Sequence, residues 1–242
     1  MYMKKLNNTK LTKEKNLLKL VENSNNKLEF QKDKIKSKIV CGINIIGDGY
    51  DKKKKEVIHN TVCHRFIGFD TYEDLFLELQ NKSNVDRCYF EVIKSHCKPY
   101  LDIEFIKKEY PDINETIIDK IIKDIIAIFK TKYRLTLEEN DVIVSESHKY
   151  DDKKEIIKYS WHIIISPLKY NYVYQHNRFG NENTACDLLY HLFEMNKLYI
   201  EIIDMSVYSK EREMRLFLCN KNPLENRILK WNNYNIKKID FK

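Results

Sequence analysis

The sequence predicts an α+β fold for this chain of 242 residues. Segments with the two-residue period of strands are interspersed with segments that have the 3.6-residue period of helices. No internal repeat and no low-complexity linker divides the chain. The length suits one compact domain or two small lobes with an ample core.

The strands are expected where apolar and polar residues alternate between turn signals. They are predicted near residues 38–46, 62–69, 87–93, 99–106, 141–147 and 157–166. A lysine-rich loop that contains glycine separates the first two strands. Residues 202–231 are expected to form short strands and turns.

Four helices are predicted around these strands. The clearest covers residues 114–132, because Ile117, Ile121, Ile125 and Ile128 recur at helical spacing. The others are expected over residues 71–81, over about 184–199 with Thr184 as the N-cap after a polar loop, and over 10–35 as a charged amphipathic segment.

Two carboxylates lie on one predicted strand. In Leu101-Asp102-Ile103-Glu104-Phe105 the apolar residues would face a core, and Asp102 and Glu104 would project together from the other face. Their side chains would lie roughly 6.5–7 Å apart along the strand. Such a pair suits hard divalent cations, although for a lone pair an exposed strand face is the more common explanation.

A second strand carries polar donors on one face. Lys158, Ser160 and His162 alternate with Tyr159 and Trp161, so an ammonium, a hydroxyl and an imidazole would face one way. These groups suit a negatively charged ligand. His162 considered alone fits a buried core histidine as well.

Scarce arginines follow a third carboxylate, Asp204. The chain has seven arginines against 36 lysines, and two of them, Arg212 and Arg215, come soon after Asp204. Arginine holds phosphate oxygens with a planar fork, whereas lysine supplies a point charge. The choice of arginine therefore indicates that geometry matters at these positions.

These motifs together resemble the archaeo-eukaryotic primase superfamily, and most closely its eukaryotic and viral primase-polymerase (PrimPol) branch. The matching motifs, in the family's order, are Asp102-Ile103-Glu104, Ser160-Trp161-His162, Asp204-Met205-Ser206-Val207-Tyr208, Arg212-Glu213-Met214-Arg215-Leu216 and Lys221. Weaker upstream matches are His64-Arg65, Thr71-Tyr72-Glu73 and Cys88-Tyr89-Phe90-Glu91-Val92-Ile93. The resemblance covers residues from about 60 to 221.

The resemblance implies roles for these residues. Asp102, Glu104 and Asp204 would be catalytic and would bind two Mg²⁺ or Mn²⁺ ions. The nucleoside triphosphate would be held by Arg65, Lys158, Ser160, His162, Arg212, Arg215 and Lys221, with nucleic acid as the alternative contact of Arg212.

The resemblance also implies an organisation. After an N-terminal helical segment, 1–36, it divides residues 37–242 into lobe one (about 37–97 plus 168–200) and an RRM-like lobe (about 98–167 plus 201–242), with the metal site between them.

The implied activity is that of a DNA primase and DNA-directed DNA polymerase in replication or damage tolerance. A primer 3′-hydroxyl would attack the α-phosphorus of a nucleoside triphosphate, a reaction for which two metals and cationic donors are suited. The expected partners are DNA template-primer, nucleoside triphosphates, and a helicase or zinc-binding module on a longer or separate chain.

Composition agrees with a polyanionic partner. The net charge is +7, and the chain has neither an apolar run long enough to cross a membrane nor a signal-peptide pattern. We therefore expect an intracellular protein without a membrane partner. Nucleus and viral replication compartment remain equally open.

The six cysteines form no Cys-x-x-Cys pair and are expected to be reduced. Cys63-His64 and His96-Cys97 leave a zinc site as an alternative. No Cys/His cluster follows Asp204, where related primase-polymerases carry a zinc-binding module that supports primer initiation. We therefore expect either that this chain extends primers better than it starts them or that it is the catalytic core of a longer protein.

Two other functions are open from the sequence. A DnaQ-like 3′–5′ exonuclease also uses an Asp-x-Glu strand and two metals, and Asp124 or Asp141 would supply its further carboxylate. That function leaves Ser160, His162 and the two arginines without a role. A non-catalytic nucleic-acid-binding module explains the positive charge but not three carboxylates that would repel phosphate.

Overall fold

The computed structural model describes residues 28–29, 31–51, 53–93, 96–151, 156–166, 174–175, 184–209 and 211–232. Most of the helix predicted over residues 10–35 therefore lies outside the described residues. Its described end is not one helix: Glu29 forms an antiparallel bridge with Phe66, and the short 3₁₀ helix η1 (Lys32–Lys34) follows.

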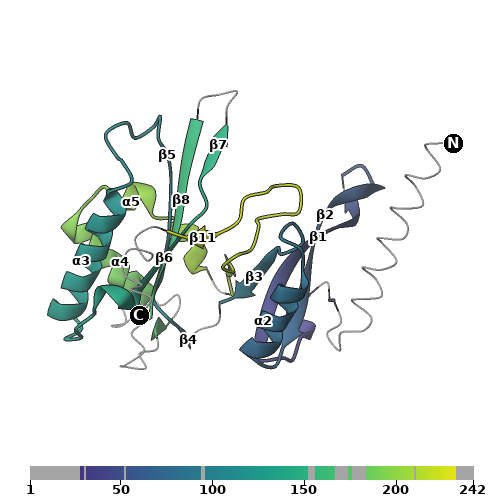
Figure 1. Ribbon diagram of the computed structural model, residues 1–242, viewed down its shortest axis with the longest axis horizontal. Coiled ribbons are helices and arrows are strands. Elements are labelled where there is room, and N and C mark those ends of the chain that lie inside the picture. Colours follow the sequence, from purple (N-terminus) through teal and green to yellow (C-terminus); the bar gives the residue numbers. More distant parts are fainter. Residues whose placement is uncertain are drawn as a thin grey trace, which may run out of the picture.

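Two antiparallel sheets organise the molecule and lie side by side along its long axis (Figure 1). The first sheet has the strand order β10-β3-β1-β2. Its strands are β1 (Ile39–Asp51), β2 (Glu56–Phe69), β3 (Tyr89–Val92) and β10 (Glu213–Arg215). Helix α2 (Tyr72–Asn81) covers one face, where Leu75 joins a core that contains Cys41 and Ile67.

The hairpin of β1 and β2 is longer than predicted. Pairing continues past a register irregularity between Gly47 and Gly49 to Asp51 opposite Glu56, so residues expected in the loop belong to strands. Because β3 pairs only with residues 41–43 of β1, the outer part of the hairpin is a two-stranded ribbon.

The second sheet has the order β11-β6-β8-β5, with the short strand β7 beside β8. Its strands are β5 (Tyr100–Ile106), β6 (Val142–Glu146), β7 (Lys149–Asp151), β8 (Ile156–Ile165) and β11 (Lys230–Trp231). A separate two-stranded pair joins β4 (His96–Cys97) to β9 (Tyr174–Gln175).

Helices cover the outer face of this sheet, and its other face turns toward the middle of the molecule (Figure 1). They are α3 (Ile117–Thr131), α4 (Ala185–Met195) and α5 (Tyr199–Ile202), and the 3₁₀ helices η2 (Glu139–Asp141) and η4 (Met205–Tyr208) complete the described elements. The isoleucine stripe of α3 is buried against Leu101, Ile103 and Phe105. Thr184 caps α4 as predicted, because its hydroxyl accepts a hydrogen bond from the Asp187 N–H.

The α+β class is confirmed, but the structure groups two segments differently from the predicted lobe boundaries. Helix α4 was expected in lobe one, yet Leu188, Leu189 and Leu192 are buried with α3 in the core of the second sheet. Strand β10 was expected in the RRM-like lobe, yet it pairs with β3 in the first sheet. The apolar face of α4 is buried by the second sheet, and the free edge of β3 is paired by β10; only the tertiary structure reveals these partners.

Candidate functional site

Strands β5 and β8 place the predicted donors and carboxylates on one face. Asp102 pairs with His162, and Glu104 pairs with Ser160. Directly paired residues of an antiparallel sheet project to the same side, so the four side chains form a compact polar group. The intervening residues, Leu101, Ile103, Trp161 and Ile163, are buried in the helix-covered core.

The third carboxylate joins this group through the backbone. The Asp204 N–H donates to the Asp102 carbonyl at 2.8 Å, next to a bridge between Ile103 and Ile203. The Asp204 side chain accepts a hydrogen bond from the Ser206 N–H at 2.8 Å and so caps η4. Residues distant in sequence therefore lie on neighbouring extended segments.

The surroundings of Asp102 disfavour its charged form. Burial raises its pKa to about 7, and the negative charges of Glu104 and Asp204 add to the rise, while Arg215 and Lys158 oppose it. Its Oδ1 is buried without a hydrogen-bond partner among the described residues. A buried, unpaired carboxylate oxygen beside two further carboxylates suits a cation.

The side chains are nevertheless not gathered as metal ligands. In the described part of the chain, no three His, Cys, Asp or Glu side chains form a group that could hold a metal ion. Glu104 instead pairs with Lys158, whose Nζ lies 2.5 Å from Oε2. The donor types fit a hard divalent cation, and binding it would require these side chains to turn toward one another.

A neutral imidazole and a guanidinium lie near the carboxylates. His162 is 7% exposed, and its Nε2 lies 3.8 Å from Asp102 Oδ1, too far for a hydrogen bond. Burial and the charges of Arg215 and Arg227 lower its pKa to about 3, so the imidazole is neutral at pH 7. Burial and Arg227 likewise lower the pKa of Arg215 to about 10.

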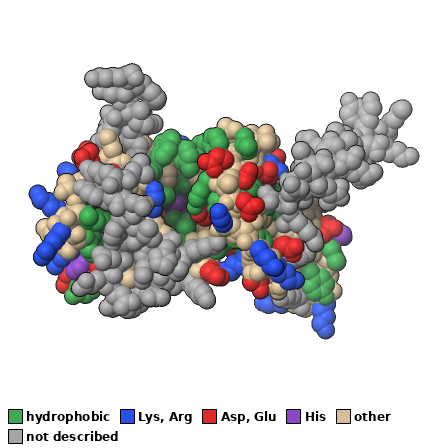
Figure 2. Space-filling view, turned by 90° about the horizontal axis from the view of Figure 1, so that it is seen from below, with side chains coloured by type: hydrophobic (Ala, Val, Ile, Leu, Met, Phe, Trp, Pro, Cys, Tyr) green, Lys and Arg blue, Asp and Glu red, His purple; other side chains and the backbone are tan. Residues whose placement is uncertain are grey.

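A cavity of about 590 Å³ separates the two sheets beside this group. His162 and Arg215 contribute to its wall, and the three carboxylates do not. The rest of the wall is mostly apolar and includes Ile39, Val40, Val92, Met214, Tyr100, Ile143, Ile164 and Trp231. The space-filling view of one face shows hydrophobic side chains around the narrow middle of the molecule (Figure 2).

The other predicted residues are placed less centrally. Arg212 precedes β10, and its carbonyl accepts a hydrogen bond from the Ile93 N–H at 2.8 Å. Lys221 is exposed, and its carbonyl accepts from the Asn44 amide at 2.8 Å. Arg215 pairs with Phe90, and Phe90 pairs with Gly42, so these three residues share one face of the first sheet. Arg65 pairs with Ile43, the next residue along β1, and therefore lies on the opposite face. The structure does not bring Arg65 to the group.

His64, next to Arg65, is on the face of Arg215. Its Nε2 lies 3.0 Å from Glu213 Oε2, and its Nδ1 lies 2.7 Å from Asn44 Oδ1. Gly42 makes room for this network, because a Cβ there would lie 2.1 Å from Glu213 Oε2 and 2.6 Å from the His64 ring.

The zinc alternative gains no support from the described residues. All six cysteines are free, and Cys63 is buried while the neighbouring His64 is exposed on the opposite strand face. The candidate carboxylates of an exonuclease are also occupied elsewhere. Asp124 accepts from the Tyr199 hydroxyl at 2.5 Å on the helical side of the sheet, and Asp141 accepts from the Glu138 N–H at 2.9 Å.

Sequence reasoning missed Arg227, Ser145 and Ser147. Ser145 pairs with His162 across β6 and β8, and Ser147 follows on the same face. The Ser147 hydroxyl donates to the Arg227 carbonyl at 3.3 Å. The scarcity of arginine that singled out Arg212 and Arg215 applies equally to Arg227 and would have found it.

Charge on the visible face is mixed. Figure 2 shows basic side chains dispersed among acidic ones and not gathered in one patch. None of the described helices has both the length and the apolar character needed to cross a membrane.

No family model matches the chain. A protein of Acanthamoeba polyphaga mimivirus with the name "Uncharacterized putative helicase R8" is 27% identical to it over 189 residues. The matched region is 71% of this chain and 18% of the mimivirus protein, so the chain spans less than a fifth of that relative's length.

Proposed function

We propose that this chain is the catalytic core of a primase-polymerase that performs template-directed nucleotidyl transfer. One observation carries the proposal: Asp102, Glu104 and His162 share one face of the second sheet, Asp204 is bonded to the Asp102 backbone, and the charge of Arg215, from the first sheet, acts on Asp102. Carboxylates for metal next to cations for phosphate are the two requirements of phosphoryl and nucleotidyl transfer.

The topology of the second sheet supports the proposed RRM-like lobe. The chain runs β5-α3-β6-β8-α4 and then reaches Ile203, which bridges to Ile103 on β5. The spatial order is thus β6, β8, β5 and the residue 203 segment, as in a split β-α-β core with a rudimentary fourth strand. The first sheet would form the other lobe of the family's core.

Asp102, Glu104 and Asp204 would hold the Mg²⁺ or Mn²⁺ ions. When bound, these ions supply charge stabilisation to the attacking and leaving oxygens. Asp102 must lose its proton to serve as a ligand, and its pKa of about 7 permits that at neutral pH. Lys158 must give up part of its pairing with Glu104, and its ammonium is then available to phosphate.

Arg215 and His162 would hold the triphosphate. Arg215 is charged at neutral pH, since its pKa remains about 10, and offers a fork of N–H donors. His162 is neutral, so one ring N–H can donate to a phosphate oxygen. Its lowered pKa makes it a poor base, which fits the role of a donor. No nucleophilic side chain is required.

The mimivirus relative carries a helicase name, and that description concerns the mimivirus protein. It supports a nucleic-acid context here, because a primase-polymerase and a helicase act on the same substrate. The exonuclease alternative has weaker support, since Asp124 and Asp141 are engaged away from the site.

The test compares nucleotide incorporation with primer degradation on one labelled primer-template. We expect Mn²⁺-dependent extension, its loss in Asp102→Ala and Asp204→Ala, and normal extension in Asp112→Ala, which removes an exposed carboxylate elsewhere. Primer shortening without extension would support the exonuclease instead. Binding without either reaction would support the non-catalytic module.

A further inference from the structure

Arg227 has a buried donor that nothing in the described chain satisfies. Its Nε is buried without a hydrogen-bond partner among the described residues. Glu225 Oε2 forms an ion pair with it at 3.7 Å, which is beyond hydrogen-bond reach, from a side chain that is 36% exposed. Buried guanidinium donors are almost always paired, so an unpaired one indicates an acceptor that the folded chain itself does not provide.

The backbone of Arg227 is held firmly beside Arg215. Its carbonyl accepts from Arg215 Nη1 at 3.1 Å, and its N–H donates to Asn220 Oδ1 at 2.7 Å. Asn220 is fully buried and donates in turn to the Asn84 carbonyl at 2.5 Å. This network joins the segment after Lys221 to the first sheet and fixes where the second arginine lies.

Two arginines are thereby kept close together. The Arg215 guanidinium lies against the Arg227 backbone through the 3.1 Å bond to its carbonyl, and the Arg227 charge adds to the burial that disfavours the charged form of Arg215. Keeping like charges together in a half-buried place is unfavourable unless an anion binds between or beside them. An anion with several oxygens at different angles would satisfy both forks, and phosphate has that geometry.

We propose that Arg227 is a further phosphate-binding residue, which acts with Arg215 as a two-arginine clamp on the terminal phosphates of a nucleoside triphosphate. This assignment deepens the proposed function and rests on it for the identity of the ligand. The polyphosphate itself is recognised by charge and oxygen geometry, so inorganic tripolyphosphate is a sufficient probe.

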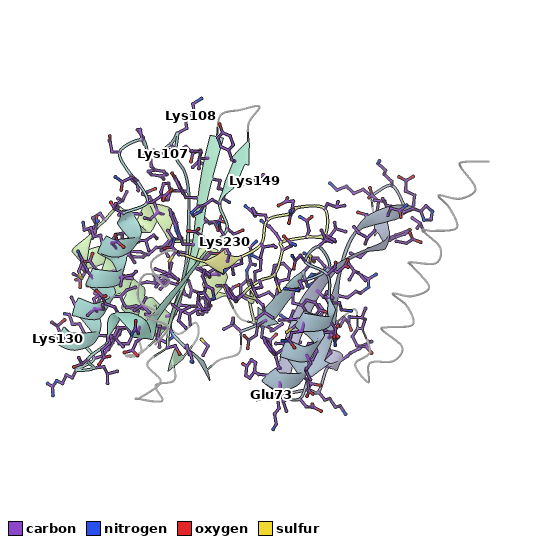
Figure 3. All side chains as sticks on the ribbon, viewed as in Figure 1. Glu73, Lys107, Lys108, Lys130, Lys149 and Lys230 are labelled. Carbon is purple, nitrogen blue, oxygen red and sulfur yellow. The ribbon has the colours of Figure 1, made fainter. Side chains whose placement is uncertain are left out.

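The first arm of the test measures binding of inorganic tripolyphosphate to the whole chain by calorimetry in EDTA. We expect Arg227→Ala to weaken binding about ten- to a hundred-fold, and Arg227→Lys to recover only part of the loss because Lys lacks the fork. Lys130→Ala removes the same charge from an exposed position on α3, far from the cleft (Figure 3), and should leave binding unchanged.

The second arm measures steady-state incorporation with Mn²⁺. Arg227→Ala should raise KM for the nucleotide with primer-template affinity unchanged. If wild type incorporates nucleotides and Arg227→Ala changes neither tripolyphosphate binding nor KM, the clamp is overturned and the proposed function stands. Arg227-dependent tripolyphosphate binding without any incorporation would support the clamp and reject the proposed function.

Folding is checked by thermal melting before either arm. Arg227→Met keeps the apolar stem and the backbone contacts. If the alanine variant is unfolded, the methionine variant replaces it in both measurements. A methionine variant that binds tripolyphosphate as tightly as wild type would reject the clamp, since Arg227 would then act only through its carbonyl on Arg215.

Discussion

The Asp204 N–H donates a hydrogen bond to the Asp102 carbonyl at 2.8 Å. This bond fixes two carboxylate-bearing residues on adjacent extended segments, although they are far apart in sequence. The separation of their backbones is therefore fixed, and only the side-chain torsions decide how closely the carboxylates approach. Repulsion between the carboxylates then becomes a property of the folded state that a cation can relieve.

The first prediction concerns Asp102→Asn. The substitution keeps the shape of the side chain and removes the buried charge, so we expect loss of Mn²⁺ binding and of nucleotide addition. Without metal at pH 8, the variant should be more stable than wild type by about 1–4 kcal/mol. Urea denaturation in EDTA measures the difference, and a less stable variant would contradict the repulsion described above.

The second prediction is the pH dependence of that difference. The pKa of Asp102 is raised from 3.8 to about 7 on folding, so between these values the folded chain binds more protons than the unfolded chain. Its contribution to stability is present at low pH and is lost as pH rises through about 7. The stability advantage of Asp102→Asn should thus be small at pH 4 and large at pH 8.

Mn²⁺ should reverse this dependence for wild type, because the ion requires the ionised carboxylate. His162 changes stability with pH in the opposite direction, because its lowered pKa costs stability below about pH 6.5. Both proteins contain His162, so its effect cancels when wild type is compared with Asp102→Asn at each pH. A pH-independent difference between the two proteins would show that Asp102 ionises normally.

The third prediction separates two roles of His162. Its ring has no hydrogen bond to Asp102 at 3.8 Å, so His162→Asn should fold and should lower kcat/KM for the nucleotide about ten- to a hundred-fold. Primer-template affinity should be unchanged. An unfolded His162→Asn, as judged by circular dichroism, would mean that the buried histidine serves the core.

Local pattern predicted much of this site. The alternation in β5 and β8 correctly assigned Asp102 and Glu104 to the face opposite Leu101, and Ser160 and His162 to the same polar face. Such faces depend only on the two-residue period of strands, which sequence displays directly.

Tertiary pairing was not predictable in the same way. Nothing in residues 213–215 indicates that they join β3, and the leucines of α4 do not reveal which sheet they cover. Arg65 was placed by its neighbours in a motif, whereas register decides which side of the sheet it occupies. Arg227 lies in no motif that was recognised; the scarcity of arginine singles it out in the sequence, and its buried Nε without a hydrogen-bond partner singles it out in the structure.

The fourth prediction tests the close packing around Gly42. A Cβ at this position would meet Glu213 Oε2 at 2.1 Å and the His64 ring at 2.6 Å, so Gly42→Ala should break the His64–Glu213 pair. Because both contacts are to ends of partly exposed side chains that can move aside, we expect a loss of at most about 1 kcal/mol in the free energy of unfolding. Gly47→Ala is the matched control on the same strand, because its Cβ would meet only Cys63 Sγ at an ordinary 3.8 Å.

The final prediction concerns how synthesis begins. A polymerase that starts without a primer must hold two nucleotides, and the 5′ nucleotide has no duplex to anchor its triphosphate. Under the proposed function, the described residues would supply one group of phosphate donors, His162, Arg215 and Arg227. We therefore expect residues 1–242 to extend an annealed primer readily with Mn²⁺ and to start primers poorly. Template binding should weaken steeply with salt, since backbone phosphates would provide most of the contact.

The measurement of initiation supplies labelled nucleotides to a bare single-stranded template and to the same template with a primer. Efficient dinucleotide synthesis on the bare template would reveal a second triphosphate site within this chain.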